Sequence, residues 1–181
     1  MRGARRCHPP CARARGFTIV ELIAVLLLLG ILAATATSRM VGGNAYAPAL
    51  ISQQLIALGR LAQQTAMSRQ DVSVSLEVDQ NAGDWRFRVQ VNDGATTLTA
   101  REERAEVANT SIVAANGATT LPLGAAAPLR LAFDGLGNLS AASVAATTLV
   151  PGLGVGVRTN GDSASSVCIG SAGHAYRGNC S

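Results

Sequence analysis

Glu21 is the side chain whose surroundings are hardest to explain by ordinary packing. It lies in a run, residues 17–36, that is otherwise apolar except for Thr18 and Thr35. About 20 helical residues at about 1.5 Å each span roughly 30 Å, the thickness of the hydrocarbon core of a bilayer. Because a carboxylate at the bilayer centre costs about 2.5–3.5 kcal/mol on insertion scales, an acid inside such a run is a candidate functional residue.

The segment that precedes the apolar run is basic. Residues 1–16 contain five arginines and no acid, so we expect this end to stay in the cytoplasm and the rest of the chain to lie outside. Two ordinary interpretations are a simple anchor and a secretory signal peptide cut after the small-x-small triplet Ala34-Thr35-Ala36. The length of the run, the interruption by Glu21 and the Gly16-Phe17 junction at its polar edge count against a signal peptide.

A third interpretation rests on the stretch RGFTIVELIAVLLLLGILAATA, which begins at Arg15. This stretch resembles the N-terminal signature of type IV pilins and of the pseudopilins of type II secretion. The resemblance implies that a prepilin peptidase cuts between Gly16 and Phe17 and methylates the new terminal amine of Phe17. Glu21 then becomes the fifth residue of the mature chain. Ile19-Val20 stand where Leu-Ile is commoner, and both replacements are conservative.

The resemblance gives Glu21 a role in assembly rather than in catalysis. When apolar helices bundle in a filament and water leaves, the carboxylate needs a cation, which the terminal amine of Phe17 on a neighbouring subunit can supply. Removing one partner of a buried ion pair costs about 3–5 kcal/mol, so the pair favours one stagger of neighbours. The alternative is an acid tolerated near the membrane interface. The implied partners are the prepilin peptidase, sibling pilin or pseudopilin subunits and an inner-membrane assembly platform.

The overall basicity of the chain belongs to its first residues. The net charge is +4 and the pI is about 9.3, but from residue 17 onward 10 arginines stand against 11 acids. That part of the sequence contains no basic patch, aromatic ladder or nucleic-acid motif. We therefore expect no binding to DNA or RNA.

The cysteines divide between the two ends of the chain. Cys7 and Cys11 lie in the expected leader, where the stretch CHPPC makes a poor metal site because it is discarded on cleavage. Cys168 and Cys180 remain, in a compartment that permits oxidation. A disulfide between them closes a loop of about a dozen residues, worth about 3 kcal/mol in the chain-entropy model, and clamps a final hairpin. Two free thiols are the alternative.

No arrangement of residues in the sequence predicts an enzyme. Cleavage at Gly16 leaves His174 as the only histidine, and the chain has no nucleophile elbow, metal-ligand cluster or phosphate loop. The stretch GLGVG at 152–156 weakly resembles a dinucleotide loop but leads into a strand pattern instead of a helix. The charged stretch REERAE at 101–106 indicates a solvated turn or edge, or a contact with a partner subunit. We expect no catalytic residue, no cofactor and no metal.

A second helix should follow the apolar run after an interruption at residues 38–48. Gly42-Gly43 and Pro48 are poor in a helix interior. The helical pattern resumes over 49–70, with an apolar stripe at three- and four-residue steps. The stripe contains Ile51, Leu55, Leu58, Leu61 or Ala62, and Thr65 or Ala66. Such a stripe most simply packs against a sheet.

The remainder of the chain has the alternation of antiparallel strands. Residues 72–79 and 85–92 alternate apolar and polar around the turn sequence NAGD, which predicts a hairpin. Shorter strands are expected within 95–100, 105–114, 129–140, 147–152 and 154–160, and the Ala-rich segment 114–128 is expected to be a loop.

The predicted fold class is α+β and pilin-like, a long N-terminal helix packed on an antiparallel β-sheet head. Residues 1–16 form a cytoplasmic leader that is removed. Residues 17–38 form a transmembrane and filament-core helix, 39–70 a linker and amphipathic helix, and 71–181 a periplasmic β-rich head.

A weaker resemblance covers the second half of the chain. The stretches LGRLAQQTAMSRQDVSVSL, LAFDGLGNLS and SVCIGSAGHAYRGNC, in this order, resemble H-type minor pseudopilins and the minor pilins of mannose-sensitive haemagglutinin-type pili. This implies a low-abundance subunit that helps to initiate or cap a filament, anchored once in the bacterial inner membrane. The sequence leaves open whether the machine is a pilus or a secretion system. The alternative is a secreted or membrane-anchored soluble β domain that binds a ligand and never polymerises.

Overall fold

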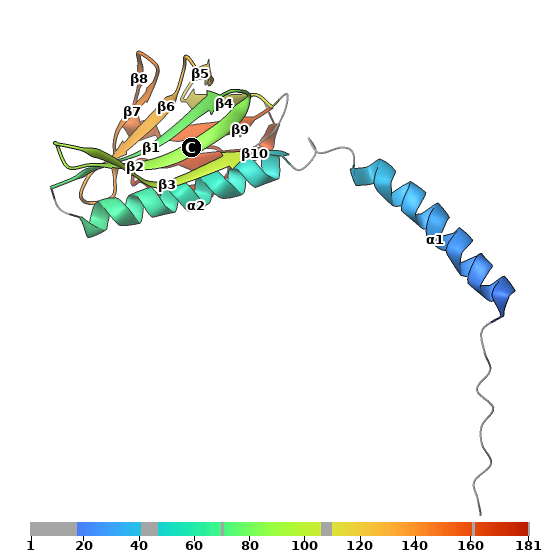
Figure 1. Ribbon diagram of the computed structural model, residues 1–181. Helices are drawn as coiled ribbons and strands as arrows, with labels where there is room; N and C mark the ends of the chain where they lie inside the picture. Colours follow the sequence, from blue (N-terminus) through green and yellow to red (C-terminus); the bar gives the residue numbers. More distant parts are fainter. Residues whose placement is uncertain (1–17, 41–46, 70, 106–109, 161, 181) are drawn as a thin grey trace, which may run out of the picture. The chain divides into compact units, whose positions relative to one another are not determined.

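The computed structural model describes residues 18–40, 47–69, 71–105, 110–160 and 162–180, with side chains for all of these except 33–40 and 162–164. The chain divides into two compact units (Figure 1). The first, Met1–Gly42, holds helix α1 (Ile19–Met40), and the second, Gly43–Ser181, holds helix α2 (Ala47–Ser68) and every described strand. The predicted break at Gly42-Gly43 lies outside the described residues.

Helix α2 begins two residues earlier than the sequence pattern predicts. Pro48 is its second residue, a position where the missing N–H breaks no intrahelical bond and the fixed φ angle suits the helix. The predicted apolar stripe is confirmed for Ile51, Leu55 and Leu58, which are buried. At the two positions where the sequence left a choice, the buried residues are Ala62 rather than Leu61, and Ala66 rather than Thr65. Small side chains on this face allow the helix to approach the sheets closely.

The strands form two antiparallel sheets. The six-stranded sheet has the order β3 (Thr97–Ala105), β2 (Asp84–Asn92), β1 (Ser73–Asn81), β6 (Leu129–Phe133), β7 (Leu139–Val144), β8 (Thr147–Leu149). The five-stranded sheet has the order β11 (Ala175–Arg177), β10 (Asp162–Ile169), β9 (Val155–Thr159), β4 (Ile112–Asn116), β5 (Thr119–Pro122).

The predicted hairpin of β1 and β2 is confirmed. Its strands pair in register from Ser73 opposite Asn92 to Asn81 opposite Asp84. The two turn residues, Ala82 and Gly83, both have positive φ angles of 53° and 94°, as expected for the two-residue turn that matches the twist of a hairpin.

The prediction of a loop over 114–128 is wrong. The segment contains the end of β4, all of β5, and a bridge between Gly124 and Ala127. Its Ala and Thr side chains give too weak an alternation to mark strands, and β5 is an edge strand whose side chains are mostly exposed. Two other strands also differ from the prediction: 129–140 is the hairpin of β6 and β7, and the strand expected over 95–100 continues as β3 to Ala105.

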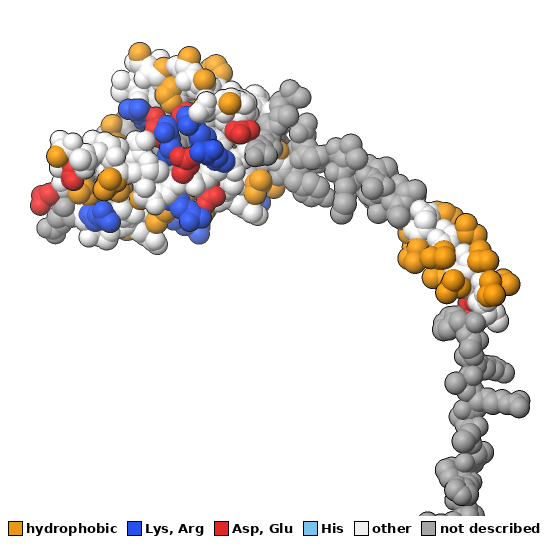
Figure 2. Space-filling model, in the orientation of Figure 1, with side chains coloured by type: hydrophobic (Ala, Val, Ile, Leu, Met, Phe, Trp, Pro, Cys, Tyr) orange, Lys and Arg blue, Asp and Glu red, His pale blue; other side chains and the backbone are white. Residues whose placement is uncertain are grey.

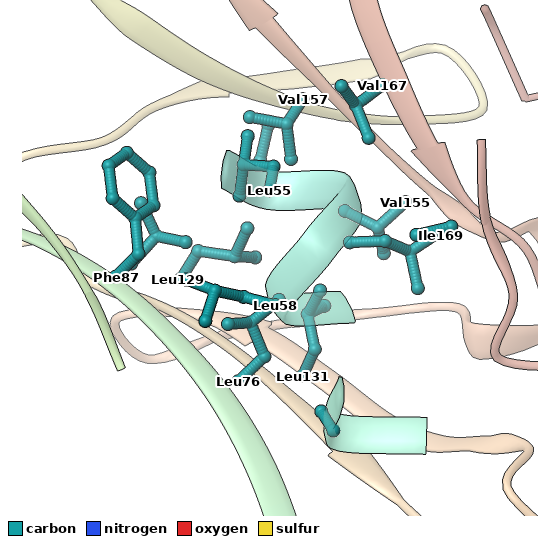
Figure 3. Packing of buried hydrophobic residues seen from close by; sticks show 14 of the residues in the cluster. Leu55, Leu58, Leu76, Phe87, Leu129, Leu131, Val155, Val157, Val167 and Ile169 are labelled. Atoms are coloured by element: carbon teal, nitrogen blue, oxygen red, sulfur yellow. The ribbon is translucent and has the colours of Figure 1, made fainter. Parts of the chain in front are cut away.

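The hydrophobic core lies where α2 meets both sheets. Figure 3 shows Leu55 and Leu58 of α2 between side chains of the six-stranded sheet, such as Leu76 and Phe87, and side chains of the five-stranded sheet, such as Ile169. All of these are at most 3% exposed. The structure therefore has the predicted α+β architecture, with an amphipathic helix packed on antiparallel sheets.

Polar contacts also fix α2 against the loops of the two sheets. The Gln63 side-chain amide donates hydrogen bonds to the carbonyl oxygens of Gly137, at 3.3 Å, and Ala172, at 2.8 Å. Gly137 belongs to the turn between β6 and β7, and Ala172 to the turn between β10 and β11. One side chain of α2 thus links a turn from each sheet.

Candidate functional site

The start of α1 is capped by Thr18. The Thr18 hydroxyl oxygen accepts a hydrogen bond from the Glu21 N–H at 3.2 Å, and the Thr18 carbonyl accepts one from the Leu22 N–H at 3.1 Å. A Thr followed three residues later by Glu has the spacing of a capping box. Sequence analysis missed the role of Thr18, although this Thr-x-x-Glu spacing could have indicated it.

Glu21 is an exposed acid in the first turn of α1. An acid at this position is stabilised by the partial positive charge of the helix N-terminus. Among the described residues, no hydrogen bond or ion pair reaches the Glu21 carboxylate. Within the described part of the chain, the carboxylate is therefore open to a partner.

The other two residues of the predicted processing site, Gly16 and Phe17, lie outside the described residues. The structure thus places Glu21 but neither the predicted scissile bond nor the predicted terminal amine. Cleavage, methylation and the pairing of Glu21 with a neighbouring Phe17 stay predictions.

Helix α1 carries a continuous apolar surface. Every large apolar side chain from Ile19 to Leu32 is between 47% and 79% exposed, and hydrophobic side chains cover the visible face of this part of the helix in Figure 2. In the described part of the chain, no helix combines the length and the apolar character required to span a membrane. Because a helix that is apolar on all sides is normally buried, the described surface of α1 calls for an apolar environment.

The predicted disulfide between Cys168 and Cys180 is present. Cys168 lies in β10 and Cys180 in the segment after β11, with their Cα atoms 5.2 Å apart. The bridge therefore closes the β10–β11 hairpin, as expected, and holds the C-terminal segment on the five-stranded sheet. Within this hairpin the rings of His174 and Tyr176 stack at a centroid distance of 5.3 Å.

The outer face of the six-stranded sheet carries a row of alternating charges. Glu102, Arg88, Glu77 and Arg130 lie opposite one another on the neighbouring strands β3, β2, β1 and β6. Glu77 is in ion pairs with Arg88 at 3.1 Å and Arg130 at 3.0 Å. Figure 2 shows basic and acidic side chains gathered together on the head. Opposite charges on facing positions stabilise the pairing of the strands.

A second carboxylate completes this network. Asp79 accepts hydrogen bonds from Arg86 at 2.8 and 3.0 Å and from Arg88 at 2.8 Å. The hydrogen bond to Asp79 is the main cause of a raised pKa of Arg86. Because Glu77 and Asp79 are each bound by two arginines, the network is satisfied within the chain and offers a ligand few free groups.

The edge strand β3 contains the charged stretch singled out in the sequence. Arg101 and Arg104 are in ion pairs with Glu103 and Glu102. Residues 101–104 lie on a solvated edge as predicted, whereas Ala105 is buried and residue 106 lies outside the described part; a contact with a partner subunit stays a prediction. Charged side chains on an edge strand hinder its pairing with other strands.

The side-chain clusters that the structure describes do not form a metal site. No group of three or more His, Cys, Asp or Glu side chains in the described part of the chain is placed to hold a metal ion. The GLGVG stretch runs through a short 3-10 turn, Pro151–Leu153, into β9, so it has no helix N-terminus on which a dinucleotide phosphate could sit.

Comparison with known proteins identifies the N-terminal segment alone. Residues 11–37 match the family model of the prokaryotic N-terminal methylation motif. The match covers the apolar run, Gly16, Phe17 and Glu21, and it supports a precursor of the type IV pilin kind. No curated protein and no solved structure matches the chain.

Proposed function

We propose that this chain is a minor pilin or pseudopilin subunit. A prepilin peptidase cleaves it between Gly16 and Phe17 and methylates Phe17. The mature subunit then enters a type IV pilus or a type II secretion pseudopilus through its N-terminal helix. The observation that carries the proposal is the methylation motif at residues 11–37, because it falls on a helix whose large apolar side chains from Ile19 to Leu32 are all exposed.

The exposed surface of α1 supports two successive environments for this helix. Before assembly the arginine-rich leader keeps its end of the chain in the cytoplasm, the apolar run lies in the inner membrane, and the head lies in the periplasm. After assembly the same surface packs against the helices of sibling subunits. Both environments remove apolar side chains from water, which is worth about 25 cal/mol per Å² of buried apolar surface.

The capped start of α1 prepares Glu21 for assembly. The Thr18 hydroxyl accepts the Glu21 N–H, so this N–H of the first turn is satisfied without the carboxylate. In the bundle of helices the carboxylate pairs with the methylated amine of Phe17 on a neighbouring subunit. An unpaired charge there would cost about 3–5 kcal/mol, so the pair selects subunits that arrive in the correct stagger.

The proposal assigns no catalytic role to the chain. Its partners are the prepilin peptidase, an inner-membrane assembly platform and sibling subunits. The charged edge strand β3 opposes further strand pairing at that edge of the head. In this proposal polymerisation depends on α1, and the head is a separate periplasmic unit.

A substitution series at Glu21 tests this assembly role. Glu21→Gln keeps the size of the side chain and removes its charge, and Glu21→Ala removes both. We expect both variants to insert into the inner membrane like the wild type and to enter filaments about tenfold less or worse, because the neighbouring amine loses its partner. Membrane fractionation measures insertion, and recovery of the subunit with sheared, affinity-purified filaments measures incorporation.

The matched control is Glu103→Ala, which removes a partly exposed acid from the edge strand of the head. This variant should insert and assemble like the wild type. Wild-type incorporation of Glu21→Gln and Glu21→Ala would contradict the proposed role of the carboxylate.

A further inference from the structure

The outer face of the five-stranded sheet holds a small cavity, and two polar atoms of its lining residues lack partners in the described part of the chain. Its volume is about 100 Å³, and it is lined by Ala115, Gly117, Leu153, Gly156, Arg158, Ser166, Asn179 and Cys180. This is about three times the volume that one water molecule occupies in the liquid. The cavity therefore has room for a group of a few heavy atoms.

The register of the strands explains why these residues meet. Gly156 of β9 lies opposite Cys168 of β10 on one side and Ala115 of β4 on the other. Alternation along the strands then places Arg158 and Ser166 on this same face, because Val157 and Val167 point into the core. With no side chain at Gly156, the floor of the cavity stays open.

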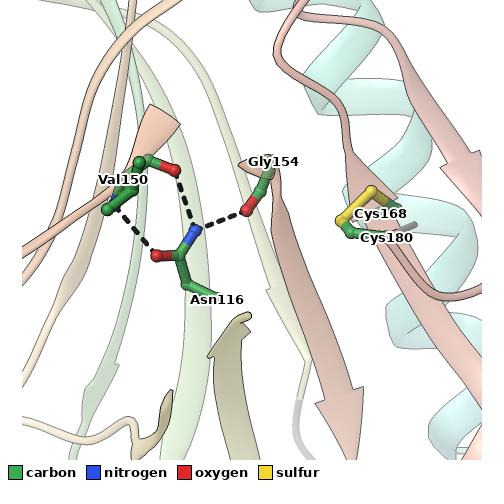
Figure 4. Close-up of a disulfide and its surroundings, with 5 residues drawn as sticks. All are labelled: Asn116, Val150, Gly154, Cys168 and Cys180. Carbon is green, nitrogen blue, oxygen red and sulfur yellow. Dashed lines mark hydrogen bonds between the residues drawn. A yellow bond between two sulfur atoms is a disulfide. The ribbon is translucent and has the colours of Figure 1, made fainter. Parts of the chain in front are cut away.

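Two segments, each fixed by a covalent or hydrogen-bonded contact, cover the cavity. The Cys168–Cys180 disulfide holds the C-terminal segment, with Asn179, over the sheet. The loop that carries Leu153 is held by Asn116, whose side chain donates to the carbonyl oxygens of Val150 at 2.9 Å and Gly154 at 2.6 Å and accepts the Val150 N–H at 2.9 Å (Figure 4). The walls are therefore fixed by the fold rather than by a ligand.

Two of the lining residues carry buried donors without acceptors in the described part of the chain. The Ser166 side chain is completely buried, and neither its hydroxyl nor the buried Nε of Arg158 has a hydrogen-bond partner among the described residues. The Nε of Arg88 in the six-stranded sheet is likewise without a partner, but Arg88 and the other arginines of that sheet are all in ion pairs with carboxylates, and Arg158 is in none among the described residues. Buried polar groups are almost always satisfied in native proteins, so this unpartnered pair points to an absent acceptor.

We propose that this cavity, which we call the Arg158 pocket, binds a carboxylate group. A guanidinium presents a planar fork of N–H donors that matches the two oxygens of a carboxylate, and the Ser166 hydroxyl and the Asn179 amide add further donors. One arginine balances the single charge of a carboxylate, whereas a phosphate dianion would leave a net negative charge in the pocket. The binding is independent of the filament role of α1.

The carboxylate can come from a free small acid or from an acidic side chain of another protein. Both sources present the same two oxygens to Arg158, and the rest of the molecule projects out of the pocket. A free small acid makes no contacts outside the pocket. An acidic side chain is attached to a peptide backbone, which can make further contacts with the rim of the pocket. The two sources therefore differ in how a peptide-like extension changes the affinity.

Acetate is the first probe, and NMR of the full-length protein in detergent micelles is the measurement. The Nε–H resonance of Arg158 is followed while sodium acetate replaces sodium chloride at constant ionic strength. We expect a saturable shift with half-saturation at millimolar acetate. No acetate-specific shift would mean that water alone fills the pocket, and it would overturn the proposal.

Two variants tie the shift to the pocket. Gly156→Ala adds a Cβ in ordinary contact with Ala115, at 3.6 Å from its carbonyl oxygen and 3.7 Å from its Cβ, so the sheet tolerates it while the floor is filled. Ser166→Ala removes a donor that has no partner among the described residues and should leave the fold intact. Each should weaken acetate binding by about tenfold.

The control Gly124→Ala, whose Cβ meets nothing within 4 Å, should bind like the wild type. Unchanged binding in both pocket variants would place the site elsewhere and overturn the proposal.

N-acetyl-glutamic acid α-amide is the second probe and identifies the source. If it shifts the Arg158 resonance at lower concentration than acetate, the pocket takes an acidic side chain. If acetate binds at least as tightly, the pocket takes a free small acid. Both of these results support a carboxylate site.

Discussion

Asp134 closes the turn between β6 and β7 with a single carboxylate. It accepts hydrogen bonds from the N–H groups of Leu136 at 2.9 Å and Asn138 at 2.8 Å, and from the Asn138 side chain at 3.2 Å. These bonds, the Asn138 N–H first among them, lower the pKa of Asp134 below its ordinary value. The turn that these bonds form also accepts a hydrogen bond from Gln63 of α2. Asp134 therefore supports the contact between α2 and the six-stranded sheet.

The lowered pKa predicts how stability depends on pH. Because the folded pKa of Asp134 lies below the unfolded value of about 3.9, its contribution is complete above that value and is lost as the pH falls through the folded pKa. We expect Asp134→Asn to reduce the loss of stability between about pH 5 and pH 2. Urea unfolding across this range, with an NMR titration of the carboxyl, measures both quantities.

The control at this scale is Asp93, whose pKa is lowered chiefly by the N–H of Thr96 in a separate turn. Its titration should be unchanged in Asp134→Asn. A pKa of Asp134 at or above the ordinary value would contradict the account of the turn.

At the scale of elements, α2 is positioned by the absence of a side chain at Gly59. A Cβ at this position would lie 2.8 Å from the Cβ of Ala175 in β11, closer than two carbon atoms can pack. We expect Gly59→Ala to lower the free energy of unfolding by about 1–3 kcal/mol, because overpacking outweighs the gain in helix propensity of about 1 kcal/mol. Urea unfolding of the full chain in micelles measures the change.

A double-mutant cycle separates packing from backbone effects. Removing the facing methyl with Ala175→Gly should recover part of the stability lost in Gly59→Ala. Gly135→Ala, whose Cβ would meet nothing within 4 Å, is the control and should show no comparable loss. Equal stability of Gly59→Ala and the wild type would show that α2 is not held at this distance.

Several elements could be predicted from the sequence because their patterns are strong. Strands β1 and β2 alternate large apolar side chains around a turn with the right residues, and α2 repeats Ile51, Leu55 and Leu58 on one face. The end of β4 and all of β5 have short side chains, and β5 is a mostly exposed edge, so neither alternation nor hydrophobicity marked them as strands. The choice of Ala62 over Leu61 depends on how closely α2 approaches the sheets, which no local pattern encodes.

The two candidate sites also differ in whether the sequence alone could reveal them. Glu21 stands out in the sequence because its charge contrasts with an apolar run of contiguous residues. The Arg158 pocket joins residues from β4, β9, β10 and the C-terminal segment, and only the register of the five-stranded sheet brings them together. A charged residue such as Arg158 has no distinguishing neighbour in the sequence, so its missing partner could be recognised only in three dimensions.

At the scale of the whole molecule, the two units differ in how far they bury their own apolar side chains. The unit Gly43–Ser181 has a buried core and a disulfide that closes its last hairpin. The unit Met1–Gly42 contains α1, whose described apolar side chains are exposed in the single chain. The second unit therefore buries its apolar side chains within the chain, whereas the described part of α1 leaves its large apolar side chains exposed.

The N-terminus of the mature protein, determined by mass spectrometry of protein isolated from membranes, tests the proposed function most directly. We predict a peptide that begins at Phe17 with a methylated amine, because cleavage after Gly16 creates the amine that pairs with Glu21. A peptide that begins at Thr37 would instead show cleavage after Ala36 by a signal peptidase. Glu21 would then be discarded with the signal, and the chain would be a secreted β domain rather than a filament subunit.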